Sequence, residues 1–305
     1  MKILITGAFG YIGNEILKIL TTKNNIFILA NDNSKDAFEK FYPIWKEKIE
    51  YINEDICDLK CPSDVDFVIH LAAEVGWIKC SKDENKAIRT NILGSKNIAS
   101  FSKPTLFFST DCVYGDVQGV YEESVMCNPK TLYAQTKLEA ERIFKSVPHC
   151  IIRPATAYGI GEYNNRDDLL VHNLSKLAAK EGEISLFQPN TVRSICHIST
   201  IVQFVQFCIE NWSSCKGQIL NIGTEAEVLT KKEIVKKISK HCDCKIRNIS
   251  GEDPDCRNNK TDYSRIISLC GRKKINVDSK IEQIVQYYLK GENESYCNNN
   301  NKSSF

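Results

Sequence analysis

The sequence predicts an α/β fold in which helices cover both faces of a doubly wound parallel sheet. Through the first half of the chain, short and almost wholly apolar runs alternate with segments whose apolar residues recur at helical spacing. Strands that are apolar along their whole length are buried on both faces, as in parallel sheets. The second half is less regular, and it predicts a smaller C-terminal lobe interleaved with the last strands of the sheet.

Each element follows from its local pattern. Six strands are expected in the first half, over residues 2–6, 26–31, 49–52, 65–71, 104–110 and 149–153. The helices expected between them cover residues 11–22, 82–102 and 133–146. Farther along, we expect helices over residues 168–180, 199–211, 231–241, 262–270 and 280–290, and strands over residues 184–187 and 218–222. The tail, residues 296–305, is of low complexity and is expected to be flexible.

Composition excludes several classes of protein. The 40 Lys and Arg residues nearly balance the 38 Asp and Glu residues, so the net charge of +2 argues against a protein that binds nucleic acid or an anionic membrane. Apolar runs are much shorter than the roughly 20 residues of a membrane helix, and no signal-peptide pattern is present, so a cytoplasmic location is expected. The 14 cysteines include no Cys-x-x-Cys pair, and the cluster of His241, Cys242, Cys244 and Cys256 fits no standard zinc spacing. We expect no metal site.

The first strand runs into a glycine-rich turn, Gly7-Ala-Phe-Gly10-Tyr-Ile-Gly13, followed by a helix. Glycines at these positions let the backbone turn tightly and approach a pyrophosphate, which then faces the helix N-terminus. Asp32, at the end of the second strand, can accept hydrogen bonds from the adenosine ribose and would repel a 2′-phosphate. The pattern predicts a dinucleotide site that prefers NAD; Lys35 nearby leaves NADP as the alternative.

A second motif lies farther along. Tyr133 and Lys137 are spaced to share one face of a predicted helix. A phenol with a pKa of ~10 is a poor base, but a nearby ammonium group and a positively charged nicotinamide ring favour the phenolate. Thr110 ends a predicted parallel strand and so reaches the sheet edge where the cofactor lies. It can hydrogen-bond the substrate oxygen that Tyr133 deprotonates. A surface tyrosine beside a solvated lysine is the alternative interpretation.

Together these motifs resemble the extended short-chain dehydrogenase/reductase family, in the branch that acts on nucleotide-linked sugars, over nearly the whole chain. The resemblance implies a Rossmann-type dinucleotide-binding domain over residues 1–160 and a substrate-binding lobe over residues 161–295. It implies a catalytic group of Thr110, Tyr133 and Lys137. The implied cofactor contacts are Gly7, Phe9, Gly10, Tyr11, Ile12, Gly13, Asp32, Asp55, Ile56, Leu71, Ala72, Ala73, Asn91, Lys137 and Pro154. The implied substrate contacts are Glu74, Thr110, Asp111, Cys112, Asn173, Arg193 and Arg257, the two arginines toward a diphosphate.

Departures from the family narrow the reaction. Cys112 stands where sugar 4,6-dehydratases carry a glutamate used in proton transfer, which argues against 4,6-dehydration. GDP-fucose synthase-type enzymes do carry a cysteine there as an acid/base, so Cys112 is either reactive or simply a small buried thiol. His172 is either a partner acid or a residue without a catalytic role, and Glu74 either lines the sugar pocket or caps a turn.

The resemblance implies an NAD-dependent nucleotide-sugar epimerase, in which Tyr133 deprotonates the C4 hydroxyl and a 4-keto intermediate is reduced again. The first alternative is an NAD(P)H-dependent reductase of a nucleotide-linked 4-keto-6-deoxy sugar, with Tyr133 as the acid. The second is a non-catalytic dinucleotide-binding protein, although Tyr133 and Lys137 are both present. Family members commonly dimerise through the helices expected here over residues 82–102 and 133–146, so a homodimer is implied. The nucleotide and the sugar stay open.

Overall fold

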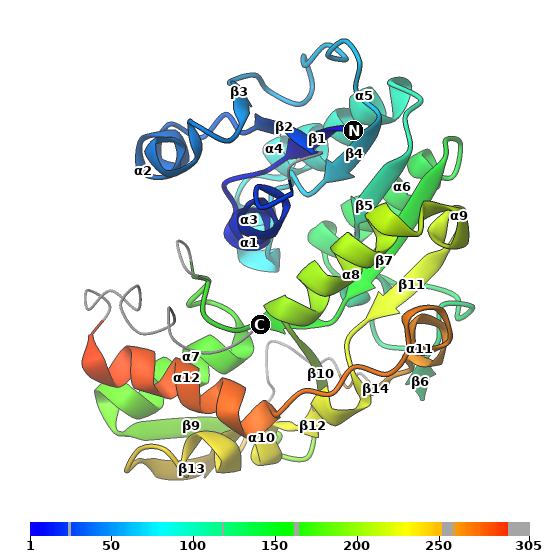
Figure 1. Cartoon of the computed structure of the whole chain (residues 1–305). Coiled ribbons are helices and arrows are strands. Elements are labelled where there is room, and N and C mark those ends of the chain that lie inside the picture. The colour runs from blue at the N-terminus through cyan, green and yellow to red at the C-terminus, as the bar shows by residue number, and fades with distance from the viewer. Residues whose placement is uncertain (24–25, 118, 162–164, 252–257, 259, 292–305) are drawn as a thin grey trace.

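A computed structural model describes residues 1–23, 26–117, 119–161, 165–251, 258 and 260–291 (Figure 1). Within these ranges, no helix is long and apolar enough to cross a membrane. The main feature is a sheet of seven parallel strands in the order β11-β7-β5-β4-β1-β2-β3. The strands are β1 (Lys2–Thr6), β2 (Phe27–Asn31), β3 (Glu50–Ile52), β4 (Phe67–His70), β5 (Thr105–Phe108), β7 (His149–Pro154) and β11 (Ile219–Ile222). The predicted fold class is confirmed.

The strand order reverses beside β1. From β1 the chain builds outward through β2 and β3, and it then crosses back to add β4, β5 and β7 on the other side. In an open α/β sheet, the point between two such halves leaves a crevice at the carboxyl ends of the strands. The ends of β1 and β4 therefore form the place where a ligand is expected.

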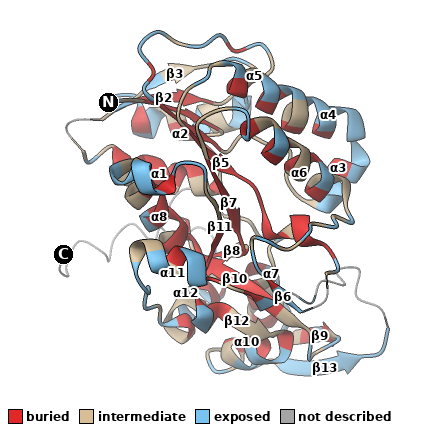
Figure 2. Ribbon diagram, turned by 90° about the vertical axis from the view of Figure 1, so that its right-hand side faces the viewer, coloured by how far each residue is buried: buried red, intermediate tan, exposed pale blue. Residues whose placement is uncertain are grey.

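Both faces of this sheet are buried (Figure 2). Ile3 and Ile5 of β1 belong to one apolar cluster, whereas Leu4 between them belongs to another. Because successive strand residues point to opposite faces, this alternation means that helices cover each face. Helices α1 (Tyr11–Leu20) and α8 (Ile198–Glu210) supply one cover, and α5 (Ser95–Ser100) and α6 (Leu132–Phe144) supply the other.

Two features of the first half differ from the sequence-based expectations. The helix expected over residues 82–102 begins at Glu84, where the Asp83 carboxylate accepts the Lys86 N–H at 2.9 Å. It comprises α4 (Glu84–Ile88), a π-helical turn (Arg89–Gly94) and α5, and a separate short helix, α3 (Trp77–Lys82), precedes it. Helix α2 (Lys35–Trp45) was not expected, because five of its eleven residues are charged or proline. The side chain of Ser34 caps it.

The second half of the chain builds a second apolar core. This core combines α7 (Leu170–Glu181), α10 (Lys231–Ile238) and α12 (Val277–Lys290), which lie together in Figure 1. Short strands complete it: β8 (Thr156–Tyr158), β10 (Val192–His197) and β12 (Val228–Thr230) form one sheet, and β9 (Glu183–Phe187) pairs with β13 (Lys245–Ile249). The remaining elements are β6 (Val120–Tyr121), β14 (Lys260–Thr261), α9 (Trp212–Cys215), α11 (Ser264–Cys270) and 3₁₀ turns over Asp111–Tyr114 and Glu225–Glu227.

Candidate active site

The glycine-rich turn joins β1 to α1 where backbones approach closely. Gly7 has a φ of +68°, and a Cβ atom there would lie 2.8 Å from the Ala72 nitrogen. At Gly13, a Cβ atom would lie 2.4 Å from the carbonyl oxygen of Gly7. The N-terminus of α1 carries no side-chain cap and no acidic residue in its first turn. Its N–H groups can therefore receive an anion, and the turn fits the pyrophosphate of a dinucleotide.

Asp32 lies directly against this turn. Its two carboxylate oxygens accept the N–H groups of Phe9 at 3.3 Å and Ser34 at 3.0 Å. Burial raises the pKa of Asp32, and the two backbone hydrogen bonds oppose that rise. Lys35 instead points to solvent, where its ammonium group lies 3.7 Å from the Glu39 carboxylate. Asp32, and not Lys35, therefore lies beside the turn. A carboxylate at this place favours a ribose without a 2′-phosphate.

The expected adenine-side residues, Asp55 and Ile56, follow β3. Burial alone would raise the pKa of Asp55, but hydrogen bonds from the Cys57 N–H and the Arg89 guanidinium outweigh it and lower the pKa. A Cβ atom at Gly94 would lie 2.4 Å from the Ile56 side chain. The π-helical turn therefore presses directly against Ile56.

Tyr133 occupies the first turn of α6, which the Thr131 side chain caps by accepting the Ala134 N–H at 3.2 Å. Thr110 lies just beyond β5, and its side chain is near enough to Tyr133 to help lower the pKa of that phenol. The pKa of Tyr133 is raised above its usual value, chiefly by burial and then by the neighbouring Cys112, while the Arg166 charge and the Thr110 side chain oppose that rise. The two elements thus bring together the phenol and the hydroxyl singled out in the sequence.

Lys137 follows Tyr133 by one turn of α6 and is only 3% exposed. Its ammonium nitrogen lies 4.4 Å from the centre of the Phe107 ring. Burial lowers the pKa of Lys137 to about 7, while the negative charge of Glu141 raises it. The lysine can therefore gain or lose its proton near neutral pH, which makes its charge sensitive to each neighbour.

Arg166, which no sequence motif marks, acts on the phenol of Tyr133 through its charge. Its charge lowers the pKa of both Tyr133 and Tyr11. Its Nη2 atom lies 4.0 Å from the point where a Cβ atom would stand on Gly76. Two hydrogen bonds of 2.6 Å to the Asp168 carboxylate orient the guanidinium. Arg166 lies in an irregular segment, so neither periodicity nor spacing signals it.

Asn91 fastens the segment that follows β4. Its amide accepts the Glu74 N–H at 2.8 Å and donates to the Glu74 carbonyl at 3.0 Å and to Thr136 of α6 at 2.9 Å. The segment between β4 and Glu74, which consists of Leu71, Ala72 and Ala73, is therefore held at both of its ends. The Glu74 carboxylate itself forms a 2.8 Å ion pair with Lys86.

His172 lies inside the protein with both ring nitrogens engaged. Nε2 donates to the Gly159 carbonyl at 2.9 Å, which also accepts the Tyr11 hydroxyl at 2.5 Å. Nδ1 lies 3.1 Å from the Tyr288 hydroxyl of α12. Burial lowers the pKa of His172. These contacts favour the interpretation of His172 as a residue that joins α1, α7 and α12.

The other expected residues lie on several different elements. Asp111 is buried, and the half-buried Cys112 has its sulfur 3.6 Å from the Asp111 carboxylate. Asn173 is exposed on α7, and Arg193 is buried on β10. Pro154 ends β7, opposite Ile222 of β11. Arg257 and Cys256 lie outside the described residues, as does the tail. Among the residues described, no group of three or more His, Cys, Asp or Glu side chains could hold a metal ion.

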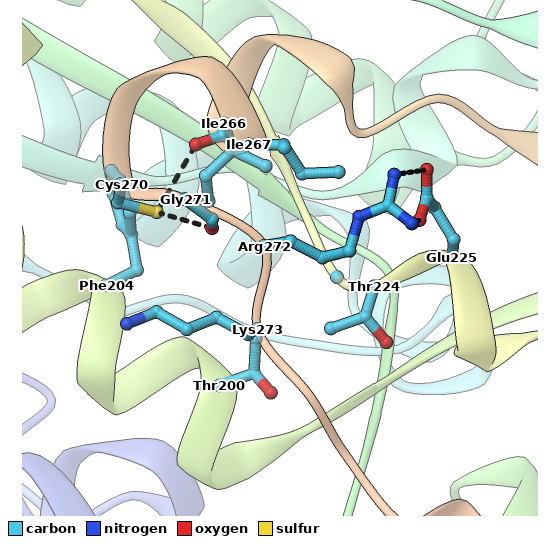
Figure 3. A pocket seen from close by; sticks show the side chains of 11 residues that line it. Thr200, Phe204, Thr224, Glu225, Ile266, Ile267, Cys270, Gly271, Arg272 and Lys273 are labelled. Atoms are coloured by element: carbon cyan, nitrogen blue, oxygen red, sulfur yellow. Dashed lines mark hydrogen bonds and ion pairs between the residues drawn. The ribbon is translucent and has the colours of Figure 1, made fainter.

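A separate small cavity lies between α8, the end of β11 and α11 (Figure 3). Its volume is about 20 Å³, and its lining includes the Arg272–Glu225 ion pair of 2.9 Å. The Cys270 thiol on its wall donates to the carbonyls of Ile266 and Gly271. None of the residues expected to bind cofactor or substrate lines this cavity, and it is too small for a nucleotide.

Comparisons with known proteins agree with this arrangement. A model of the NAD dependent epimerase/dehydratase family matches residues 3–223. UDP-glucuronic acid decarboxylase 6 of Arabidopsis thaliana is 27% identical, over 89% of this chain and 83% of its own length. The uncharacterized UDP-glucose epimerase YtcB of Bacillus subtilis is 28% identical, over 78% of this chain and 82% of its own. UDP-glucuronic acid 4-epimerase from Bacillus cereus has a similar fold, with a TM-score of 0.82 at 21% identity, over 95% of this chain and 99% of that one.

Proposed function

The chain belongs to the NAD dependent epimerase/dehydratase family, and we propose that it is a nucleotide-sugar 4-epimerase that causes no net oxidation of its substrate. One observation carries this proposal. Thr110 follows β5 and acts on Tyr133, Lys137 follows Tyr133 by one turn of α6, and the glycine turn and Asp32 follow β1 and β2 of the same sheet. A base, a hydrogen-bonding hydroxyl and a cation beside a dinucleotide cradle suit the oxidation and re-reduction of a secondary alcohol.

In the proposed mechanism, NAD, when bound, supplies the hydride acceptor and donor. Thr110 holds the C4 oxygen of the sugar while Tyr133 accepts the proton of that hydroxyl. Lys137, in its charged form, stabilises the phenolate by Coulomb attraction, and Arg166 adds a second positive charge. Tyr133 returns the proton to the same oxygen when the 4-keto sugar is reduced on its other face. Protons and hydride balance over the cycle.

For binding, we propose that the glycine turn holds the pyrophosphate and that Asp32 holds the adenosine ribose. Asp55, Ile56, the segment after β4, Asn91 and Pro154 then complete the cofactor site. Glu74, Asp111, Cys112 and Asn173 line the sugar side, and Arg193 pairs with the diphosphate of the substrate. The named relatives act on UDP-linked sugars, so UDP-glucose and UDP-glucuronic acid are the first substrates to test.

The test begins with the dinucleotide that co-purifies with the protein. We expect bound NAD, and we expect the protein to convert a UDP-sugar to its 4-epimer without added cofactor. The Tyr133→Phe variant should abolish turnover and keep its NAD. Turnover only of a 4-keto sugar, and only with reduced cofactor supplied, would assign the reductase alternative. Release of CO2 from UDP-glucuronic acid would assign oxidative decarboxylation. Unchanged behaviour of the Tyr133→Phe variant would support a non-catalytic role.

We also propose a homodimer formed through the helices on the α6 side of the sheet. Figure 2 shows α3, α4, α5 and α6 side by side, and these helices contact one another. Large apolar side chains are exposed on α3, α4 and the π-helical turn: Trp77, Ile78, Ile88 and Leu93. A second copy of the chain would cover them, because such clusters mark protein interfaces.

A further inference from the structure

A buried ion pair between Glu141 and Arg153 lies near Tyr133 and Lys137, because Glu141 stands on the same helix. Glu141 stands one helical turn beyond Lys137 on α6 and is 1% exposed. Its carboxylate accepts two hydrogen bonds from Arg153, of 2.9 and 2.7 Å, and one of 2.5 Å from the Ser109 hydroxyl. Tyr133, Lys137 and Glu141 thus follow one another at four-residue intervals along one stripe of the helix.

The partners of Glu141 come from β7 and from the residue that follows β5. Ser109 directly precedes Thr110, and Arg153 lies on β7. These segments are joined, because the Ser109 N–H donates to the Ile152 carbonyl at 2.8 Å. The third branch of the Arg153 guanidinium donates to the Tyr114 hydroxyl at 3.0 Å. The hydrogen bonds of Glu141 therefore link α6 to the segment after β5 that carries Thr110.

We propose that Glu141 is a positioning residue for Tyr133 and Lys137: its carboxylate, fixed by Arg153 and Ser109, holds α6 against Thr110 and keeps Lys137 in its charged form. The proposal rests on the proposed function only in giving Tyr133 the role of the base. Glu141 contacts neither reacting group, and it acts through Lys137.

The surroundings of Lys137 explain why a counter-charge matters there. Helix α3 presents Cys80, whose thiol would help to raise the lysine pKa only as an anion, and burial raises the pKa of that thiol. Strand β4 presents His70, whose pKa is lowered to about 3 by burial and which is therefore neutral. The Glu141 carboxylate is thus the charge that opposes loss of the Lys137 proton. Removing it lowers the lysine pKa below 7, so that Tyr133 loses the positive charge of Lys137 and keeps only that of Arg166.

The experiment compares Glu141→Gln with Glu139→Gln. Glu139 lies on the exposed side of the same helix, where it pairs with Arg142 at 2.8 Å, so its variant removes the same charge away from the site. Ionisation of Tyr133 is followed by tyrosinate absorbance, as the difference between each protein and its own Tyr133→Phe counterpart. We expect Glu141→Gln to raise the apparent pKa of Tyr133 and to move the acid limb of kcat/KM by about one pH unit to higher pH. Glu139→Gln should leave both unchanged.

A second variant separates charge from folding. Glu141→Gln alone leaves Arg153 buried without its partner, whereas Glu141→Gln/Arg153→Met removes both charges together. Arg153 is not among the groups that shift the Lys137 pKa, so the double variant should regain thermal stability and still show the raised Tyr133 pKa. Wild-type titration of Tyr133 in a folded single or double variant would overturn the proposal, even if thermal stability fell. The titration needs no turnover, so it can fail or succeed independently of the epimerase assignment.

Discussion

At Tyr133, burial and charge act in opposite directions on the same proton. Burial raises the pKa of the phenol, while the Arg166 guanidinium and the Thr110 hydroxyl lower it. A phenol that is to act as a base near neutral pH needs every such stabilising contact. Cations around the hydroxyl are therefore the side chains whose removal should change the pH dependence of the reaction.

The first prediction concerns Arg166. Arg166→Met removes a positive charge that acts on the phenol, so the pKa of Tyr133 should rise by about one unit and kcat/KM on the acid limb should fall about tenfold. A pH profile of kcat/KM measures this effect. Arg142→Met, which removes an exposed arginine of α6, is the matched control. A profile for Arg166→Met that matches the control would contradict the assignment.

The second prediction concerns Asp32. Asp32→Ala removes the carboxylate beside the glycine turn, so NAD affinity should fall about 10- to 100-fold while NADP affinity falls less or improves. Calorimetric titration with each dinucleotide measures the two constants. Asp36→Ala, in the first turn of α2, removes an exposed carboxylate four residues away and should leave both affinities unchanged. Equal losses for the two cofactors would argue against a ribose contact.

At the scale of elements, some helices depend on contacts with residues distant in sequence, and local sequence patterns do not predict them. The strands of the main sheet could be predicted because most of them are largely apolar, and α1 because glycines precede an apolar stripe. The π-helical turn could not, since Asn91 forms it around contacts with Glu74 and Thr136 that are distant in sequence. Helix α2 could not be predicted, because only Phe41 and Trp45 of it are buried. Its charged residues and Pro43 interrupt the apolar pattern that would mark a helix.

The same distinction applies to the candidate site. Their spacing predicts that Tyr133 and Lys137 share one face of a helix, and the rule that parallel strands deliver their carboxyl ends to one edge places Thr110 at the cofactor side. Arg166 and Glu141 are placed by packing, the first from an irregular segment and the second by an ion pair with β7. Spacing places Glu141 on the same helix stripe as Lys137, but it reveals neither the ion pair with Arg153 nor the position of Arg166. The resemblance to the short-chain dehydrogenase/reductase family is confirmed by the family match, which covers residues 3–223.

The third prediction concerns the junction of α1, α7 and α12. The pKa of His172 is lowered on folding, so the unfolded chain takes up the proton first as the pH falls below about 6.5. Its contribution to stability is present above that pH and is lost as the pH falls through the folded-state pKa. His70 and His197 are shifted in the same direction. Each such group contributes up to about 1.4 kcal/mol per pH unit to the slope.

Urea unfolding at about pH 8 and about pH 5 measures this dependence. His172→Gln removes one titrating group, and it should reduce the loss of stability between the two conditions while lowering stability at the higher pH. His149→Gln is the comparison, because His149 is only partly buried and bonds to the nearby Val147 carbonyl. If both variants showed the wild-type difference, His172 would not be a source of the acid sensitivity.

At the scale of the whole molecule, the net charge is close to zero, so charge repulsion between molecules contributes little to solubility. Exposed apolar side chains on the helices of the α6 side therefore matter more. Trp77, Ile78, Ile88 and Leu93 are each at least 40% exposed on one side of the fold. Stable dimers bury roughly 1,200–2,000 Å² in total, so a dimer interface here would extend beyond these four side chains. The composition alone could not place this surface, because apolar residues are common on any protein surface.

The fourth prediction tests that surface. Leu93→Glu puts a charge in the centre of the proposed interface, so light scattering should find a dimer for the wild type and a monomer for the variant. Ile246→Glu changes a comparably exposed residue on β13 and should remain dimeric. A monomeric wild-type protein, or an unaffected Leu93→Glu variant, would sink the dimer assignment.

The position of β11 has a consequence for how the chain is made. Six of the seven strands of the main sheet are complete once residue 154 has been synthesised, but the last edge arrives only with residues 219–222. Until then, β7 is an outer strand whose apolar residues, including Ile151 and Ile152, border open hydrogen-bonding groups. Such edges recruit other strands. A nascent or truncated chain that stops before residue 219 should therefore self-associate, whereas the finished chain closes that edge with its own segment.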